Sequence, residues 1–383
     1  MREWIERFYL SVLREEREGF FISLFKILLK VLSWIYLALI QFRFFLYRIR
    51  LFPSRSITAW VISVGNLTLG GTGKTPVVER LARLLHSRGR KVAVVSRGYR
   101  RKTGPRLKRL KEKILGAPTT RVVSDGQNIL LNARVAGDEP YMLAINLPQI
   151  PVLVNRNRVK GSLYAVRRLK ADTIILDDGF QHLALKRDLD IVLIDSGNPF
   201  GNGQLFPRGI LREPPQNLAR ADLILLTKAR ENDPGPVKKK LVGYVGKNET
   251  LCCRHSPAYL YDVRTSLKTT VDFLKGMRVA TLAGIARPEE FEKLLTRLGA
   301  EVIYSRRFAD HHFYSQQELI DVINEAQENG AEILVTTEKD AVRFTRLSPG
   351  GLPVYSLRVR IESVRDGEDF DRCMLRFLRR RKA

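Results

Sequence analysis

Cysteine is scarce in this chain of 383 residues, and its three copies are Cys252, Cys253 and Cys373. They form no C-x-x-C pair and have no companion histidines at the spacing of a zinc site. This scarcity excludes a disulfide framework and a structural zinc site, and it indicates a reducing compartment. The chain also lacks internal repeats and low-complexity tracts, so its body is an ordinary globular protein, long enough for two domains.

Acidic residues are also few, since 40 Asp and Glu stand against 66 Lys and Arg and leave a formal net charge of +26. An excess of this size indicates an anionic partner, either nucleic acid or a membrane surface that carries acidic lipid. The basic tracts lack the interleaved aromatic residues of nucleic-acid binding surfaces. We therefore expect an anionic membrane surface as a partner and no nucleic acid, and no feature indicates an obligate protein partner.

An apolar segment runs from Gly19 to Phe42, with only Lys26 and Lys30 charged and with arginines on both sides. Its uncharged part is about half of the roughly 20 apolar residues that a spanning helix needs, so a helix lying in the membrane interface is favoured over a spanning one. A helix buried in the core is a third interpretation. A cleaved signal peptide fits poorly, because the run starts late and no small-residue cleavage site follows it. We expect residues 1–52 to form a membrane-associated helical segment.

The segment GNLTLGGTGKTP follows a β-rich run, Trp60 to Val64, and precedes a stretch with helical spacing. Glycines let backbone N–H groups approach phosphate oxygens, and the helix N-terminus adds its positive dipole. Lysine supplies a phosphate cation, and the next threonine supplies a hydroxyl to Mg²⁺. We assign ATP and Mg²⁺ as cofactors and assign nucleotide binding to Gly70, Gly71, Thr72, Gly73, Lys74 and Thr75.

This P-loop departs from the pattern G-x-x-x-x-G-K-[ST] at one position, where Thr68 stands in place of the first glycine. The context supports the assignment, because a strand precedes the loop, a helix follows it, and Pro76 lies in the first helical turn, where its missing N–H costs nothing. The predicted chemistry is phosphoryl transfer.

Apolar runs typical of strands buried on both faces recur after the P-loop, and they predict an α/β fold of P-loop NTPase type with a mostly parallel sheet and helices on both faces. The runs lie at Val92–Val95, Ile150–Val154, Thr173–Leu176, Ile191–Ile194 and Leu223–Leu226. We expect a kinase domain over 53–231, a linker rich in Pro, Gly and Lys over 232–247, and a second, smaller α/β domain over 248–383. The second domain is predicted from alternating strands and helices at Val279–Leu282, Pro288–Leu298, Val302–Tyr304, Gln316–Glu328 and Ile333–Thr336.

Three polar clusters carry candidate catalytic residues. In the first, Asp138 and Glu139 precede a proline; this pattern suits a carboxylate that accepts a hydroxyl proton, and it also suits a helix start. In the second, Asp177 and Asp178 follow an apolar strand as in a Walker B motif, where strand alternation lets only one of them face Mg²⁺. Asp195, at the end of the next apolar run, is the rival carboxylate.

The third cluster is Asp310, His311 and His312, in which an Asp-His pair across an interdomain cleft could assist the base. Surface histidines are the competing interpretation; a metal phosphoesterase is disfavoured, because that chemistry needs further spaced aspartates.

Two basic features could also bind anionic groups. The run from Arg97 to Lys113 suits a phosphorylated substrate or the membrane, or is solvated surface, and the loop residues Arg208 and Arg212 suit neutralisation of transition-state charge. The C-terminal run of arginines is read as solvated surface.

Taken together, the motifs resemble those of the tetraacyldisaccharide 4'-kinase family, the lipid A 4'-kinases. The resemblance covers Trp60 to Val342 and is carried, in order, by SVGNLTLGGTGKTPV, SRGY, GDEP, DDGFQH, FGNGQLFPRGILREP, AGIARP, DHH and TEKDAV. It implies an enzyme on the cytoplasmic face of the inner membrane that moves the ATP γ-phosphate to the 4'-hydroxyl of a tetraacyl disaccharide 1-phosphate, giving lipid IV-A. The apolar N-terminal segment fits the family's membrane helix.

The resemblance also implies roles for matched residues. Asp138 is the expected base with His311 as its helper, Lys74 acts on ATP, and the expected metal ligands are Thr75, Asp177 and Asp178. Substrate binding is expected at Arg97, Glu139, His182, Arg208 and Arg212. The sequence departs from the family at RGYRRK, where a glycine-rich continuation is commoner, and at Arg208, where many relatives have alanine.

A different class of function stays open at this point, a membrane-associated P-loop ATPase or GTPase switch that couples hydrolysis to a protein partner. Thr227-Lys228 after a strand faintly resembles a guanine-reading loop, but Arg230 stands where that loop needs an aspartate. Transfer of phosphate to a lipid acceptor, as opposed to release of free phosphate, separates the two functions.

Overall fold

A computed structural model describes residues 8–9, 11–13, 15–98, 120–229, 237, 239, 241, 243–244, 249–344, 351–364 and 369–380. The basic run between residues 99 and 119, Arg230, most of the expected linker 232–247 and the last three residues lie outside this set. The described strands form one sheet of thirteen strands in the order β11-β10-β12-β13-β8-β7-β6-β1-β5-β2-β4-β3, with β9 paired to β8.

The P-loop half of the sheet is mostly parallel, as the apolar runs predict, and only its edge strand β3 runs antiparallel. Its strands are β1 (Trp60–Asn66), β2 (Val92–Ser96), β3 (Arg121–Ser124), β4 (Val152–Val154), β5 (Thr173–Asp177), β6 (Leu189–Asp195) and β7 (Leu223–Thr227). Its helices are α3 (Lys74–Ser87), α5 (Ala133–Ala136), α6 (Asp138–Asn146), α7 (Arg158–Leu169) and the 3-10 helix η1 (Pro215–Arg220).

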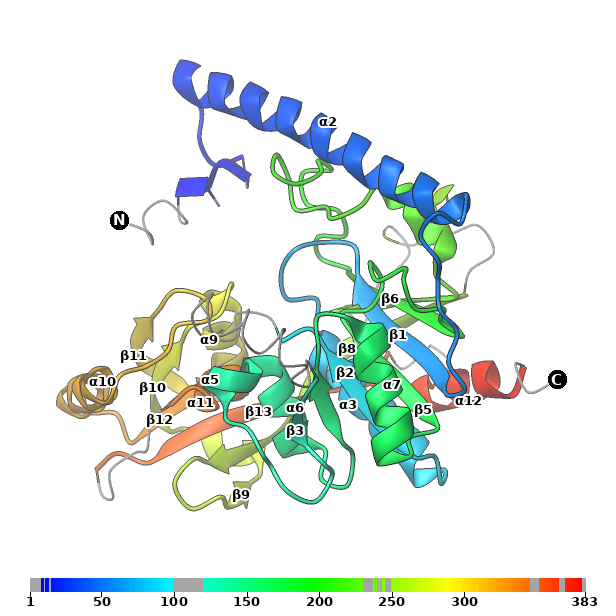
Figure 1. The fold of residues 1–383 in the computed structure, drawn as a ribbon. Helices are drawn as coiled ribbons and strands as arrows, with labels where there is room; N and C mark the ends of the chain where they lie inside the picture. The colour runs from blue at the N-terminus through cyan, green and yellow to red at the C-terminus, as the bar shows by residue number, and fades with distance from the viewer. Residues whose placement is uncertain are drawn as a thin grey trace, which may run out of the picture.

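Helices cover both faces of this half because alternate residues of its strands point to opposite sides. Ile62 and Val64 of β1 share a core with α3 and α6, whereas Val61 belongs to the core that α7 covers. The expected α/β class with helices on both faces is confirmed (Figure 1).

The second half repeats this design on a smaller scale. Its elements are β9 (Lys268–Thr269), η2 (Val271–Leu274), β10 (Arg278–Ala283), α9 (Pro288–Arg297), β11 (Glu301–Arg307), α10 (Gln316–Glu328), β12 (Ile333–Thr337), α11 (Glu338–Ala341) and β13 (Val354–Ser363). Phe291 and Leu295 of α9 pack on one face, and Leu319 and Val322 of α10 pack on the other. The two halves lie side by side, with the second to the left in Figure 1.

One long strand, β8 (Glu249–Asp262), belongs to both halves. Residues 249–252 pair in parallel with β7, and residues 253–262 pair antiparallel with β13. The C-terminal helix α12 (Phe370–Arg380) then returns to the P-loop half, where Phe370, Cys373 and Met374 join the core under α3. The expected boundaries 53–231 and 248–383 are not tested by this arrangement and stay a prediction.

The N-terminal apolar segment forms a single helix, α2 (Phe20–Arg48), that lies along the outside of the body and contacts it on one side (Figure 1). Its most apolar window is only 11% buried, so the interpretation as a buried core helix is wrong. Ser33, one of its two buried residues, donates to the main chain of Leu205 at 2.8 Å. By length and composition α2 is a candidate membrane anchor.

Candidate active site

The P-loop connects β1 to α3, and Gly73 enters the helix at φ 79°, a left-handed conformation that disfavours side chains. A Cβ at Gly73 would lie 2.1 Å from His255 Nε2, so glycine is needed here for space as well. Thr68, which replaces the first glycine of the motif, is buried and pairs with Leu211 in an isolated antiparallel bridge. Thr68 is therefore part of the wall behind the loop, which explains how a side chain fits at that position.

Lys74 begins α3, and its ammonium lies 3.2 Å from Asn66 Oδ1 and 3.2 Å from Asp178 Oδ1. Arg212 Nη1 donates to both oxygens of Asp178, at 2.8 and 2.9 Å. Burial alone would raise the pKa of Asp178, but these two cations hold it well below its ordinary value. The structure therefore joins three of the predicted site residues in one ionised group.

Asp177 differs from its neighbour. It is buried at the end of β5, where it accepts a 2.8 Å hydrogen bond from Ser96 Oγ, and it makes no ion pair within the described part of the chain. Burial, together with the nearby negative charge of Glu139, raises the pKa of Asp177 to about 6. The charge of Lys74 lowers this pKa only in part, so a divalent cation would stabilise the buried carboxylate.

The residues around the P-loop fit Mg²⁺ of the kind that nucleotide enzymes bind. No group of three or more His, Cys, Asp or Glu side chains able to hold a metal occurs among the described residues. Mg²⁺ in such enzymes needs fewer protein ligands, because substrate phosphates and waters complete its octahedron. One hydroxyl, from Thr75 at the start of α3, and one carboxylate from the end of β5 make a sufficient set.

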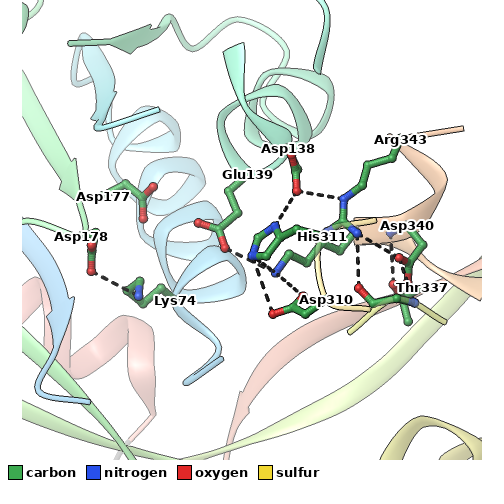
Figure 2. Close-up of polar contacts among 12 residues, drawn as sticks. Lys74, Asp138, Glu139, Asp177, Asp178, Asp310, His311, Thr337, Asp340 and Arg343 are labelled. Carbon is green, nitrogen blue, oxygen red and sulfur yellow. Dashed lines mark hydrogen bonds and ion pairs between the residues drawn. The ribbon is translucent and has the colours of Figure 1, made fainter. Parts of the chain in front are cut away.

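The second polar group connects the two halves of the molecule. Asp138 starts α6 in the P-loop half, and its Oδ2 lies 2.7 Å from Nδ1 of His311, a residue of the loop that follows β11 (Figure 2). Arg343 Nε donates to the same oxygen at 2.8 Å. Burial would raise the pKa of Asp138, but the His311 hydrogen bond and the Arg343 charge lower it below its ordinary value. Asp138 is thus both a helix start and an ionised carboxylate facing the other half.

Lys339, from α11, lies at the centre of this group. Its ammonium is 3.2 Å from His311 Nε2, 3.5 Å from Asp310 Oδ1 and 3.8 Å from Glu139 Oε1. Glu139 lies between the two polar groups, since it also acts electrostatically on Asp177 (Figure 2). The P-loop group and the Asp138–His311 pair are therefore neighbours in one site.

His312 does not share this environment. Its ring stacks on Phe308 with centroids 4.7 Å apart, and its Nε2 lies 3.1 Å from Glu318 Oε1 at the start of α10. The two adjacent histidines therefore differ in what they contact. His311 lies at the interface between the two halves, and His312 packs within the second half.

Four arginines, called here the arginine ring, act electrostatically on His182, whose Nε2 is buried and has no hydrogen-bond partner among the residues that the structure describes. Burial and, after it, the positive charges of four arginines lower the pKa of His182 to about 4. The arginines come from α2, the end of β2, α7 and the segment before β6: Arg43, Arg97, Arg158 and Arg187. This concentration of positive charge suits an anionic group of a substrate.

Two of the residues expected to bind substrate, Arg97 and Arg208, form no hydrogen bond or ion pair with the Asp178 group or with the Asp138–His311 pair in the part of the chain that the structure describes. Arg97 is exposed at the end of β2 and contributes to the arginine ring by charge. Arg208 pairs with Glu15 at 2.5 Å, and its main-chain N–H donates to Ser33 of α2 at 3.0 Å. Arg208 therefore helps to dock the N-terminal helix and is not joined to the Asp178 group by any of these contacts.

Asp195, the rival carboxylate, ends β6 and lies 2.9 Å from Lys228 Nζ and 3.8 Å from Arg287 Nη1. Asp195 thus forms ion pairs, whereas Asp177 forms none among the described residues, and this favours Asp177 as the metal ligand.

Sequence reasoning assigned no role to Lys339, Arg343 or Arg158. Lys339 belongs to the motif TEKDAV, and Arg343 directly follows it, so this motif was the available signal for both residues. Arg158 had no signal, because it lies in an ordinary amphipathic helix.

Comparison with known proteins gives a consistent result. The family model described as Tetraacyldisaccharide-1-P 4'-kinase (LpxK) matches residues 25–379. A relative named tetraacyldisaccharide 4'-kinase from Halothermothrix orenii is 38% identical over 365 residues, which is 90% of each chain. Another of that name from Syntrophus aciditrophicus is 38% identical over 366 residues, which is 93% of this chain and 94% of the relative.

A solved structure is also similar. The crystal structure of LpxK from Aquifex aeolicus in complex with ATP superposes with a TM-score of 0.70 at 30% sequence identity. The match covers 91% of this chain and 96% of that one.

Proposed function

This chain belongs to the tetraacyldisaccharide-1-P 4'-kinase family, and we propose that its two polar groups divide the family's reaction between nucleotide and acceptor. The chain is a kinase that transfers the ATP γ-phosphate to the 4'-hydroxyl of a tetraacyl disaccharide 1-phosphate in lipid A biosynthesis. The product is lipid IV-A. The observation that supports the division is the contact between Asp138 and His311 beside the P-loop group.

On the nucleotide side, the glycines and N–H groups of residues 70–75 hold the phosphates, and Lys74 neutralises charge that develops on the transferred phosphoryl group. Thr75 and Asp177 would hold Mg²⁺, which would supply positive charge that neutralises the phosphates. Asp178 keeps Lys74 and Arg212 in place, as its short contacts with both cations support. Within this proposal Asp177, of the two adjacent aspartates, is the metal ligand.

On the acceptor side, Asp138 takes the proton of the 4'-hydroxyl, and His311 holds the carboxylate in position. The proton moves to Asp138 as the acceptor oxygen attacks the γ-phosphorus and ADP leaves. Among the described residues the two side-chain donors to Asp138, His311 and Arg343, contact Oδ2, so we assign Oδ1 to the hydroxyl. Glu139 orients the acceptor beside this pair.

The arginine ring around His182 is the proposed site for the acceptor's phosphate, with Arg97 at its exposed rim. Arg212 reaches from Asp178 toward the acceptor. Arg208 acts through the N-terminal helix that it helps to dock. The neutral imidazole of His182 supplies a hydrogen-bonding nitrogen without adding charge to that of the arginines.

We place the enzyme at the cytoplasmic face of the inner membrane, attached by α2 to an anionic surface. The side chains of α2 that face away from the body support this, since large apolar residues such as Phe20, Phe21 and Trp34 are 80%, 82% and 61% exposed. The net charge of +26 would add electrostatic attraction to acidic lipid.

One assay tests the proposal. Protein in mixed micelles is incubated with Mg²⁺, γ-labelled ATP and a tetraacyl disaccharide 1-phosphate, and label is followed into lipid and into free phosphate. Label in lipid, absent with Lys74→Ala, is expected. Label that appears only as free phosphate, at a rate independent of the lipid, would indicate the hydrolytic switch instead; the names of the relatives do not favour that alternative.

A further inference from the structure

Lys339 Nζ faces the outer nitrogen of His311. The lysine is only a quarter exposed, and its 3.2 Å contact with Nε2 is shorter than its distances to the carboxylates of Asp310 and Glu139. Lys339 therefore contacts Nε2 of the ring, whereas Asp138 contacts Nδ1.

Two groups face His311 Nε2: the Lys339 ammonium at 3.2 Å and, farther away, Asp310 Oδ2 at 3.7 Å. The nearer contact, with Lys339, bears on where the imidazole carries its proton. A lysine ammonium has three donors and no acceptor, so a hydrogen bond with Nε2 requires that nitrogen to be unprotonated. The proton of a neutral imidazole must then be on Nδ1, which donates to Asp138 Oδ2 at 2.7 Å. A doubly protonated ring would place a second donor and a second positive charge against the ammonium.

The helix that carries Lys339 is fixed on both sides. Asp340 accepts hydrogen bonds from Gly284 N at 3.1 Å and from Tyr314 Oη at 2.8 Å, and these bonds attach α11 to the rest of the second half. Glu338, on the other side, contacts Asn146 at the end of α6 and Arg358 of β13. A lysine held between two such neighbours has little freedom to leave His311.

We propose that Lys339 is a positioning residue that holds His311 as the neutral Nδ1–H tautomer, through the contact of its ammonium with His311 Nε2. This inference rests on the proposed roles of Asp138 and His311. In that tautomer the imidazole donates to Asp138 throughout the reaction and keeps its own proton. The hydroxyl proton therefore ends on Asp138 Oδ1, and the acceptor oxygen forms its bond to the phosphorus as the bond to ADP breaks.

The first test reads the tautomer directly and needs no turnover. Full-length protein with ¹⁵N-labelled histidine has five histidines, and His311→Gln identifies the signal of interest by its loss. In the wild type we expect the ¹⁵N chemical shift of His311 Nδ1 to be that of a protonated nitrogen and the shift of Nε2 to be that of an unprotonated one. Lys339→Met should lose this pattern, and Lys339→Arg, which keeps a cationic donor, should retain it. An Nε2–H tautomer in the wild type, or an unchanged pattern in Lys339→Met, overturns the proposal.

The second test measures kinetics in the lipid-labelling assay. Lys339→Met should lower kcat by about 10- to 100-fold, the loss seen when partners that orient a functional histidine are removed, with little change in KM for ATP. Lys339→Arg should recover part of this loss. Lys293→Met, at an exposed position of α9, is the matched control and should match the wild type. Normal kcat in Lys339→Met would refute the positioning role. If instead the proposed function were wrong, the wild-type protein would not label the lipid.

Discussion

The hydroxyl of Tyr36, on α2, donates a 3.0 Å hydrogen bond to the main-chain oxygen of Arg212. The side chain of Arg212 binds Asp178, and Asp178 lies 3.2 Å from the ammonium of Lys74. Polar contacts therefore run without a break from the apolar helix to the lysine of the P-loop. The position of α2 and the arrangement of the nucleotide site are physically connected.

Tyr36→Phe removes the first of these contacts and leaves the ring in place. We expect kcat to fall by up to about 5-fold, because a typical net hydrogen bond is worth about 1 kcal/mol. Tyr47→Phe, on the same helix, is the control and should have normal kcat. The check is initial rate in mixed micelles at saturating ATP, and equal rates for the two variants would show that the contact is only structural.

Asp138→Asn should lower kcat far more than it raises KM for ATP. The amide keeps the size of the side chain but cannot accept the hydroxyl proton, and Asp138 is proposed to act on the acceptor, not on the nucleotide. Steady-state kinetics with ATP and lipid varied separately measure both constants. A large loss of ATP affinity with normal kcat would make Asp138 part of the nucleotide or metal site.

His311→Ala and His312→Ala separate the two adjacent histidines. The first should reduce lipid labelling by roughly 10² to 10⁴, the range for loss of acid-base catalysis, because Asp138, the base, would lose the donor that holds its carboxylate in position. The second should mainly lower thermal stability, because His312 packs on Phe308. Turnover and melting temperature are measured on both variants, and equal turnover in the two would exclude the pair of Asp138 with His311.

Removal of residues 1–50 should abolish most membrane association and leave a folded body that binds ATP. The exposed apolar side chains of α2 are removed by this deletion, whereas the P-loop begins well beyond it. Flotation with anionic vesicles and a nucleotide-binding titration give the two readouts. Full retention on vesicles would identify the basic surface as the main anchor, and its loss in about 0.5 M salt would show an electrostatic origin, since the Debye length is then well under 10 Å.

His255 should make the fold sensitive to mild acid. Burial is the main cause that lowers the pKa of His255 from its ordinary value of 6.5 to about 4, and the charge of Lys228 is the second cause. Between these values the unfolded chain binds a proton that the folded protein does not, so stability falls as pH drops from about 6.5 to about 4. His255→Gln should make urea midpoints between pH 7 and pH 5 less dependent on pH. An unchanged slope would show that other groups dominate in this range.

Local patterns predicted the fold well where the structural cause is itself local. The helix expected at Gln316–Glu328 agrees with α10 at both ends, because Ser315 and Glu318 form a capping box that fixes its start. Strands such as β5 and β7 were visible as short apolar runs buried on both faces. In contrast, β8 was not predicted, since its burial alternates irregularly as its neighbour changes from β7 to β13.

The candidate site shows the same limit. The glycines and lysine of the P-loop are adjacent in sequence and could be found as a motif. Arg343 and Lys339 act on residues that are far away in the chain, and Arg343 contacts Asp138 across 205 positions. Whether an arginine is buried against a given carboxylate depends on the packing of the two halves, which a single sequence does not display.

The strand β8 also limits how those halves can move. Each half is hydrogen-bonded to a different part of the same strand, so sliding one past the other would break main-chain hydrogen bonds. Bending and twisting near Cys252 and Cys253, where the partner strand changes, keep those bonds. A motion that kept these hydrogen bonds and changed the separation of Asp138 and His311 would therefore be a rotation about an axis within the sheet, near the point where β8 changes partner.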